Sequence, residues 1–125
     1  MHARAEVEEF IRSTFRSLWA LELLGLLRDN RQTTYPTAEI VNMMRASDYV
    51  VTKCIENLAS MGMVAVEADG AARYAPASPE LDLLAKSALD FYGSSPSAVR
   101  RIIAMATSPT ITAFADAFRL KKEDE

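Results

Sequence analysis

Apolar residues recur at helical spacing through the first quarter of the chain. Between Glu6 and Asn30 they return every three or four positions, with charged residues in many of the gaps, as on one face of an α-helix. The stretch LWALELLGLL, residues 18–27, is apolar nearly all round, which predicts deep burial of this half. The pattern therefore predicts one long helix over Glu6–Asn30.

Two shorter helices are predicted next. The first runs from about Pro36 to Arg45, because proline suits an initial helical position, where its missing N–H has no partner. The second runs from Asp48 to Met61. Ser47 can cap its N-terminus, and Gly62 can end it in a left-handed conformation. The inward face of this second helix is predicted to carry Val51, Cys54, Ile55 and Leu58.

The hydrophobic period changes to two after Gly62. The segment MVAVEA, residues 63–68, alternates like a strand, and AARYA, residues 71–75, returns as a second strand. Asp69-Gly70 between them is a strong hairpin-turn signal. Two short helices joined by a tight turn match the helix-turn-helix pattern, and a hairpin directly after the second helix would form its wing.

The C-terminal third is predicted to be helical again, with Ser95-Pro96 and Ser108-Pro109 as helix starts. The expected fold class is mainly α with a small β-hairpin, a winged helix-turn-helix with flanking N- and C-terminal helices. We expect a single winged-helix domain over residues 1–125. Its parts are an N-terminal helix (1–31), the helix-turn-helix and wing (32–78), and C-terminal helices for dimerisation (79–125).

The stretch TAEIVNMMRASDYVVTKCIENLASMGMVAVEADGAARYAPAS, residues 37–78, resembles the winged helix-turn-helix transcription regulators of bacteria. Within it, ENLASMGMV looks like the end of a recognition helix followed by the first wing strand. With long helices on both sides, the layout is similar to the MarR group, which implies a homodimer that presents two recognition helices to DNA. The wing departs from that group, because DGAARYAPAS places Arg73 two residues later than an Asp-x-Arg pattern and no Leu-Thr pair follows.

A helix that reads double-stranded DNA in the major groove needs polar side chains that reach base edges. The expected DNA-binding residues are Arg45, Tyr49, Thr52, Lys53, Asn57 and, on the wing, Arg73. The net charge of this segment argues against DNA binding. Between Pro36 and Ser78, three basic residues stand against five acidic ones, whereas DNA-binding modules are usually basic. The alternative is a winged-helix protein–protein interaction module that does not bind DNA.

The terminal helices carry more apolar residues than one small core should need, which predicts a homodimer. The expected dimerisation residues are Trp19, Ile102, Ile103, Phe114 and Phe118. Aromatic residues of this kind more often form a core or an interface, but they could also line an effector pocket.

The 125 residues contain few of the patterns that would indicate a metal site, a phosphate-binding loop or a catalytic site. The single cysteine and single histidine, Cys54 and His2, cannot form a zinc site of the usual ligand count, and the four glycines are too scattered for a phosphate-binding loop. Cys54 is expected to be a small buried hydrophobe, and the alternative is a thiol redox sensor on the recognition helix, for which only Lys53 is a basic neighbour in sequence. The sequence predicts no enzyme, no cofactor and no metal. No apolar run approaches the ~20 residues that cross a bilayer, and the expected location is the cytoplasm.

Overall fold

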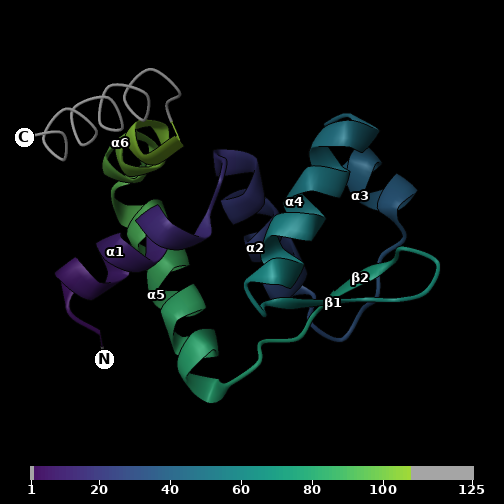
Figure 1. Ribbon diagram of the computed structural model, residues 1–125, viewed down its shortest axis with the longest axis horizontal. Helices are drawn as coiled ribbons and strands as arrows, with labels where there is room; N and C mark the ends of the chain where they lie inside the picture. Colours follow the sequence, from purple (N-terminus) through teal and green to yellow (C-terminus); the bar gives the residue numbers. More distant parts are fainter. Residues whose placement is uncertain (1, 108–125) are drawn as a thin grey trace, which may run out of the picture.

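The computed structural model describes residues 2–107, and Figure 1 shows their arrangement. This part of the chain is mainly helical, with one two-stranded antiparallel sheet. Its elements are α1 (Arg4–Thr14), α2 (Leu18–Asp29), α3 (Thr37–Met44), α4 (Asp48–Ser60), β1 (Val64–Val66), β2 (Ala72–Tyr74), α5 (Pro79–Ser94) and α6 (Pro96–Thr107). The predicted helix after Pro109 lies outside the described residues.

The prediction of one long N-terminal helix is wrong, because the chain breaks between α1 and α2. Phe15 and Ser17 have extended backbone conformations, and the Ser17 hydroxyl accepts a hydrogen bond from the Ala20 N–H at 3.2 Å. Ser17 is therefore the N-cap of a new helix. The break lets α1 pack against α5 and α6 while α2 packs against α4. Apolar residues continue at the same helical spacing on both sides of the break. The periodicity of the sequence therefore did not reveal the break.

Helix α2 lies at the centre of the molecule, between the group formed by α1, α5 and α6 and the group formed by α3, α4 and the hairpin (Figure 1). The predicted deep burial of LWALELLGLL is confirmed by its fully buried leucines. They are Leu21, Leu23, Leu24 and Leu27. At position 25 a glycine permits close approach, since a Cβ there would lie 3.2 Å from the Leu89 side chain on α5.

The turn between α3 and α4 is tight, as predicted. Helix α3 begins at Thr37, with Pro36 as its N-cap rather than its first residue, and ends at Met44, and Arg45 after it adopts the left-handed conformation (φ 54°). Ser47 then accepts a hydrogen bond from the Val50 N–H at 3.1 Å and caps α4, which confirms its predicted role. The inward face of α4 is also confirmed, since four predicted residues are buried: Val51, Cys54, Ile55 and Leu58.

The predicted hairpin is present, with Val64 opposite Tyr74 and Val66 opposite Ala72. Gly62 and Gly70 both have positive φ angles, 75° and 90°, as their predicted roles at the helix end and hairpin turn require. Tyr35 also pairs with Ala72 through two backbone hydrogen bonds of 2.8 and 2.9 Å. The segment before α3 therefore lies against the free edge of β2.

Helix α6 begins at Pro96, as predicted, and α5 begins at Pro79 with Ser78 as its N-cap. Both pack against α1 and against each other, and α5 also contacts α2 (Figure 1). None of the helices within residues 2–107 combines the length and the apolar character needed to cross a membrane.

Candidate functional site

The outward side of α4 carries a continuous row of exposed side chains, which we call the outer stripe. It consists of Tyr49, Thr52, Lys53 and Glu56, all exposed, with Tyr49 at 70 %. The row exists because Val51, Ile55 and Leu58 fill the opposite side and pack into the core, and residues three and four apart share a helix face. Three of the predicted binding residues therefore lie together on one exposed surface.

The charges of the outer stripe compensate each other. The Lys53 Nζ lies 3.5 Å from the Glu56 Oε2, and it also sits 5.6 Å from the centre of the Tyr49 ring. Both charged side chains are more than half exposed, so this ion pair contributes little to folding. Its consequence is electrostatic, because the one cation of the stripe stands beside an anion.

Asn57 was expected on the outward face, and that expectation is wrong. Its side chain is only 6 % exposed and turns toward the α1–α2 junction. The Asn57 Oδ1 accepts a hydrogen bond from the Arg16 backbone N–H at 3.0 Å, and its Nδ2 donates to the Thr14 carbonyl at 2.8 Å. Both polar groups of the amide are thus occupied in fixing the junction to α4, since a buried amide without partners would be costly.

The remaining predicted basic residues, Arg45 and Arg73, are exposed and lie on either side of the outer stripe in sequence. Arg45 forms the left-handed turn before α4 and makes no ion pair within residues 2–107. Arg73 is the outward residue of β2, and its Nε lies 3.4 Å from the Glu67 Oε1 across the hairpin. The hairpin cation, like Lys53, therefore stands beside a carboxylate.

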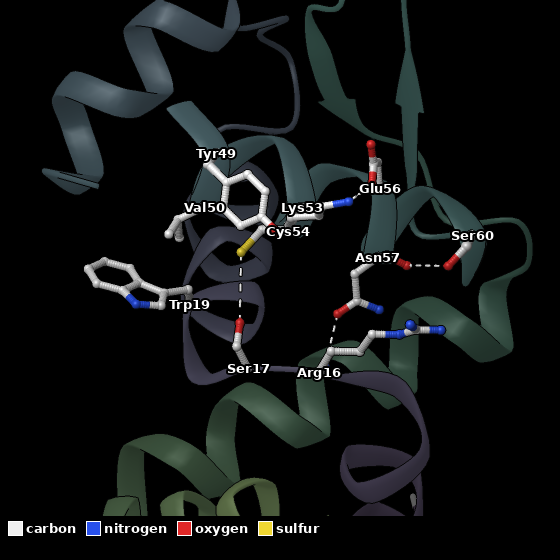
Figure 2. Close-up of a pocket in the computed structure, with 10 residues that line it drawn as sticks. All are labelled: Arg16, Ser17, Trp19, Tyr49, Val50, Lys53, Cys54, Glu56, Asn57 and Ser60. Carbon is white, nitrogen blue, oxygen red and sulfur yellow. Dashed lines mark hydrogen bonds and ion pairs between the residues drawn. The ribbon is translucent and has the colours of Figure 1, made fainter. Parts of the chain in front are cut away.

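A hollow of about 470 Å³ is lined by the α1–α2 junction, the start of α2 and one flank of α4. Figure 2 shows aromatic side chains toward one end and Arg16 toward the other. No sequence pattern indicated this hollow, because the break that forms its wall was predicted to be helix. Its lining is Arg16, Ser17, Trp19, Tyr49, Val50, Lys53, Cys54, Glu56, Asn57 and Ser60.

Cys54 lies at the floor of this hollow and is 4 % exposed, as expected for a small buried hydrophobe. Its Sγ is 3.8 Å from the Ser17 Oγ. Burial raises the pKa of the Cys54 thiol above its ordinary value, and the hydrogen bond with Ser17 only partly offsets this. A raised thiol pKa lowers the thiolate fraction and so the reactivity toward oxidants.

A cluster of polar side chains connects the hairpin to α2 and α5. The Tyr74 hydroxyl donates a hydrogen bond to the Asp82 carboxylate at the start of α5, and the Arg28 Nε of α2 lies 3.3 Å from the same carboxylate. Burial and the bond to Asp82 raise the pKa of Tyr74 to about 12. The bond from Tyr74 and the charge of Arg28 hold the pKa of Asp82 below its usual range.

Of the predicted dimerisation residues, the three within residues 2–107 do not form one exposed surface. Ile103 is 3 % exposed and packs within the protomer's own core, and Ile102 is partly buried against the same core. Trp19 is 40 % exposed but lines the hollow beside α4. Phe114 and Phe118 lie outside the described residues.

Among residues 2–107, no group of three or more His, Cys, Asp or Glu side chains is placed to hold a metal ion. Comparisons of the chain with protein-family models, with curated proteins and with solved structures gave no match.

Proposed function

We propose that this chain is a homodimeric DNA-binding transcription regulator, in which α2, α3, α4 and the hairpin form a winged helix-turn-helix. The observation that carries the proposal is the outer stripe. A helix of 13 residues presents hydroxyl and ammonium groups along one exposed side, and a helix is the element that the major groove of B-DNA admits. The tight turn before α4 and the hairpin after it supply the flanking elements of this motif.

The side chains divide by expected role. Tyr49, Thr52 and Lys53 point outward from α4 and are the candidates for contacts with base edges, where hydrogen-bond donors and acceptors carry the sequence information. Arg45 and Arg73, at the turn and on the hairpin, are the candidates for phosphate contacts, which position the protein. Asn57 leaves this set because its amide is occupied inside the fold.

Dimerisation is part of the proposal for an electrostatic reason. Residues 36–78 have three basic and five acidic side chains, so one protomer neutralises few phosphates and binds weakly. Two protomers on one duplex double the number of phosphate contacts. Binding is therefore expected to be strongly dependent on protein concentration and on salt.

A second candidate function, a winged-helix module that binds another protein, is favoured by one specific observation. The cations of α4 and of the hairpin, Lys53 and Arg73, lie beside the carboxylates of Glu56 and Glu67. A surface whose charges are already balanced attracts polyanionic DNA weakly. It suits a partner of mixed charge with polar contacts at the rim.

The test selects duplexes from a random-sequence pool with the full-length protein at low salt and measures affinity for the enriched duplex by fluorescence anisotropy. Lys53→Ala should weaken binding about tenfold if the lysine makes a base contact, worth ~1–3 kcal/mol. Lys86→Ala is the matched control, because Lys86 on α5 is also 57 % exposed and paired with a carboxylate, Asp90 at 2.9 Å.

An unchanged affinity in Lys53→Ala, or no binding to any duplex at low salt, would show that α4 does not read DNA. In that case the outer stripe serves a protein partner, and the same variant should be tested against proteins captured from the source cells.

A further inference from the structure

The α1–α2 junction places an arginine beside α4 that no sequence pattern had singled out. Arg16 is the middle residue of the break between Thr14 and Leu18. Its backbone N–H donates to the Asn57 Oδ1 at 3.0 Å, and the same Asn57 side chain holds the Thr14 carbonyl. Because Asn57 is buried within α4, the main chain at Arg16 is fixed relative to that helix.

The side chain of Arg16 is exposed and makes no ion pair within residues 2–107. Its neighbours along the chain differ in this respect. Arg12 on α1 is paired with Glu9 at 2.6 Å, and Arg28 on α2 is paired with Asp82 at 3.3 Å. The backbone of Arg16 is thus held in place, while its guanidinium group forms no ion pair within residues 2–107.

Figure 2 shows the Arg16 guanidinium on the same flank of α4 as Asn57 and Ser60, beyond the Lys53–Glu56 pair. It lines the hollow together with Lys53 and Glu56. The charged groups facing this hollow are therefore two cations and one anion, whereas the outer stripe alone has one of each. Around this hollow, the junction therefore gives this flank of α4 one cation more than the Lys53–Glu56 pair alone.

We propose that this flank binds the phosphate backbone of duplex DNA, with Arg16 as the phosphate-contacting residue and Asn57 as the residue that positions it. The inference rests on the proposed DNA-binding function and extends its interface from α4 onto the α1–α2 junction. Guanidinium groups bind phosphate oxygens through two parallel hydrogen bonds, and phosphate neutralisation supplies much of the affinity for DNA. When a helix lies in the major groove, a cation fixed beside that helix is close to the phosphates of the DNA strand that borders the groove.

The experiment measures the dissociation constant of the full-length protein for the selected duplex between about 50 and 200 mM salt. Arg16→Ala should raise Kd about threefold or more at the low end of this range and should reduce the slope of log K against log salt by about 1. The same loss should occur on an unselected duplex, because a phosphate contact carries no sequence information. Arg16→Lys keeps the charge and should restore most of the slope.

Arg12→Ala is the matched control, since it removes an exposed arginine one turn earlier whose charge is already paired. It should leave the slope unchanged. If Arg16→Ala binds like the wild type, or if Arg12→Ala lowers the slope equally, the Arg16 inference fails while DNA binding by α4 stands. If the wild-type protein binds no duplex at low salt, the proposed function itself fails and this inference with it.

Discussion

Glu56 is the residue at which the two proposed functions give opposite expectations. It is exposed on the outer stripe, 3.5 Å from Lys53, and faces the same hollow as Arg16. A carboxylate at this position repels a phosphate backbone and holds the nearest lysine away from it. For a protein partner with basic groups, the same carboxylate would be an attractive contact.

Glu56→Gln should therefore tighten DNA binding severalfold at low salt, with the gain shrinking as salt screens the charge. Fluorescence anisotropy on the selected duplex measures this. Asp90→Asn on α5 removes the acid of a comparable Lys–acid pair away from the outer stripe and should change nothing. Weaker DNA binding by Glu56→Gln would contradict the assignment of this face to DNA.

Tyr74 gives the fold a dependence on alkaline pH. Because burial and the Asp82 carboxylate favour its neutral form, its pKa in the folded protein is about 12, against an ordinary value of 10.0. A tyrosine pKa raised by folding contributes stability below the unfolded value, and this stability is lost as pH rises between about 10 and about 12. The loss follows first from ionising a partly buried phenol and then from placing a second negative charge beside Asp82.

Chemical denaturation on either side of the unfolded-state pKa, at about pH 9 and about pH 11.5, tests this. Tyr74→Phe should lose less stability between these two values than the wild type, because its ring cannot ionise. Tyr49→Phe, altered at an exposed tyrosine of α4, serves as the control and should follow the wild type. Equal losses in all three proteins would show that the Tyr74–Asp82 contact does not govern the alkaline limb.

Among the secondary-structure elements, α4 and the α1–α2 junction make a contact that joins the two halves of the molecule. Helix α1 belongs to the group with α5 and α6, whereas α4 belongs to the group with α3 and the hairpin. The Asn57 side chain bridges these groups through two hydrogen bonds to the main chain. One buried amide therefore helps to fix the orientation of α4 relative to α1 and the helices packed on it.

Asn57→Ala should lower the free energy of unfolding by about 2–3 kcal/mol, because it leaves the buried Thr14 carbonyl and the Arg16 N–H without their partner. Asn42→Ala on α3 replaces an exposed asparagine and should cost no more than about 0.5 kcal/mol. Urea denaturation followed by circular dichroism compares the two. Equal stabilities would mean that the Asn57 hydrogen bonds are not needed to hold the junction.

In the molecule as a whole, the buried core of residues 2–107 is built from side chains of one protomer. The leucines of α2 that motivated dimerisation are fully buried within the protomer, and Ile103 is buried with them. Among residues 2–107, the large exposed apolar side chains of the C-terminal helices are Leu83 and Met105. Of the residues predicted for dimerisation, Trp19 is exposed, and Phe114 and Phe118 lie outside the described residues, so the dimer stays a prediction that depends on these three.

Light scattering on the full-length protein at tens of micromolar should give the mass of two 13.8 kDa chains. Phe118→Asp should shift the protein to monomer, because burying an unpaired carboxylate in an interface costs several kcal/mol. Met43→Asp places the same charge on an exposed methionine of α3 and should leave the dimer intact. A clean monomer for the wild type would overturn the prediction.

The segment from α3 to the hairpin was predictable from the order of its amino acids. The sequence correctly indicated the buried face of α4, the Ser47 cap, the left-handed Gly62 and the Asp69-Gly70 turn. Each depends on residues within about one helical turn or one hairpin of each other, where periodicity, capping and φ preferences operate. The start of α6 at Pro96 was predictable for the same reason.

The features on which the proposed binding surface depends arise only from tertiary packing. The break at Phe15–Ser17 lets α1 pack mainly against α6 and α5 while α2 packs mainly against α4, and an uninterrupted apolar pattern cannot reveal such a break. Asn57 turns inward because its amide bonds to the main chain at Arg16 and Thr14. These partners lie 41 and 43 positions away in the chain, so no local pattern around Asn57 indicates them. The hydrogen bond between the Arg16 N–H and Asn57 also brings Arg16 beside α4. Only tertiary packing brings together residues so far apart in the sequence.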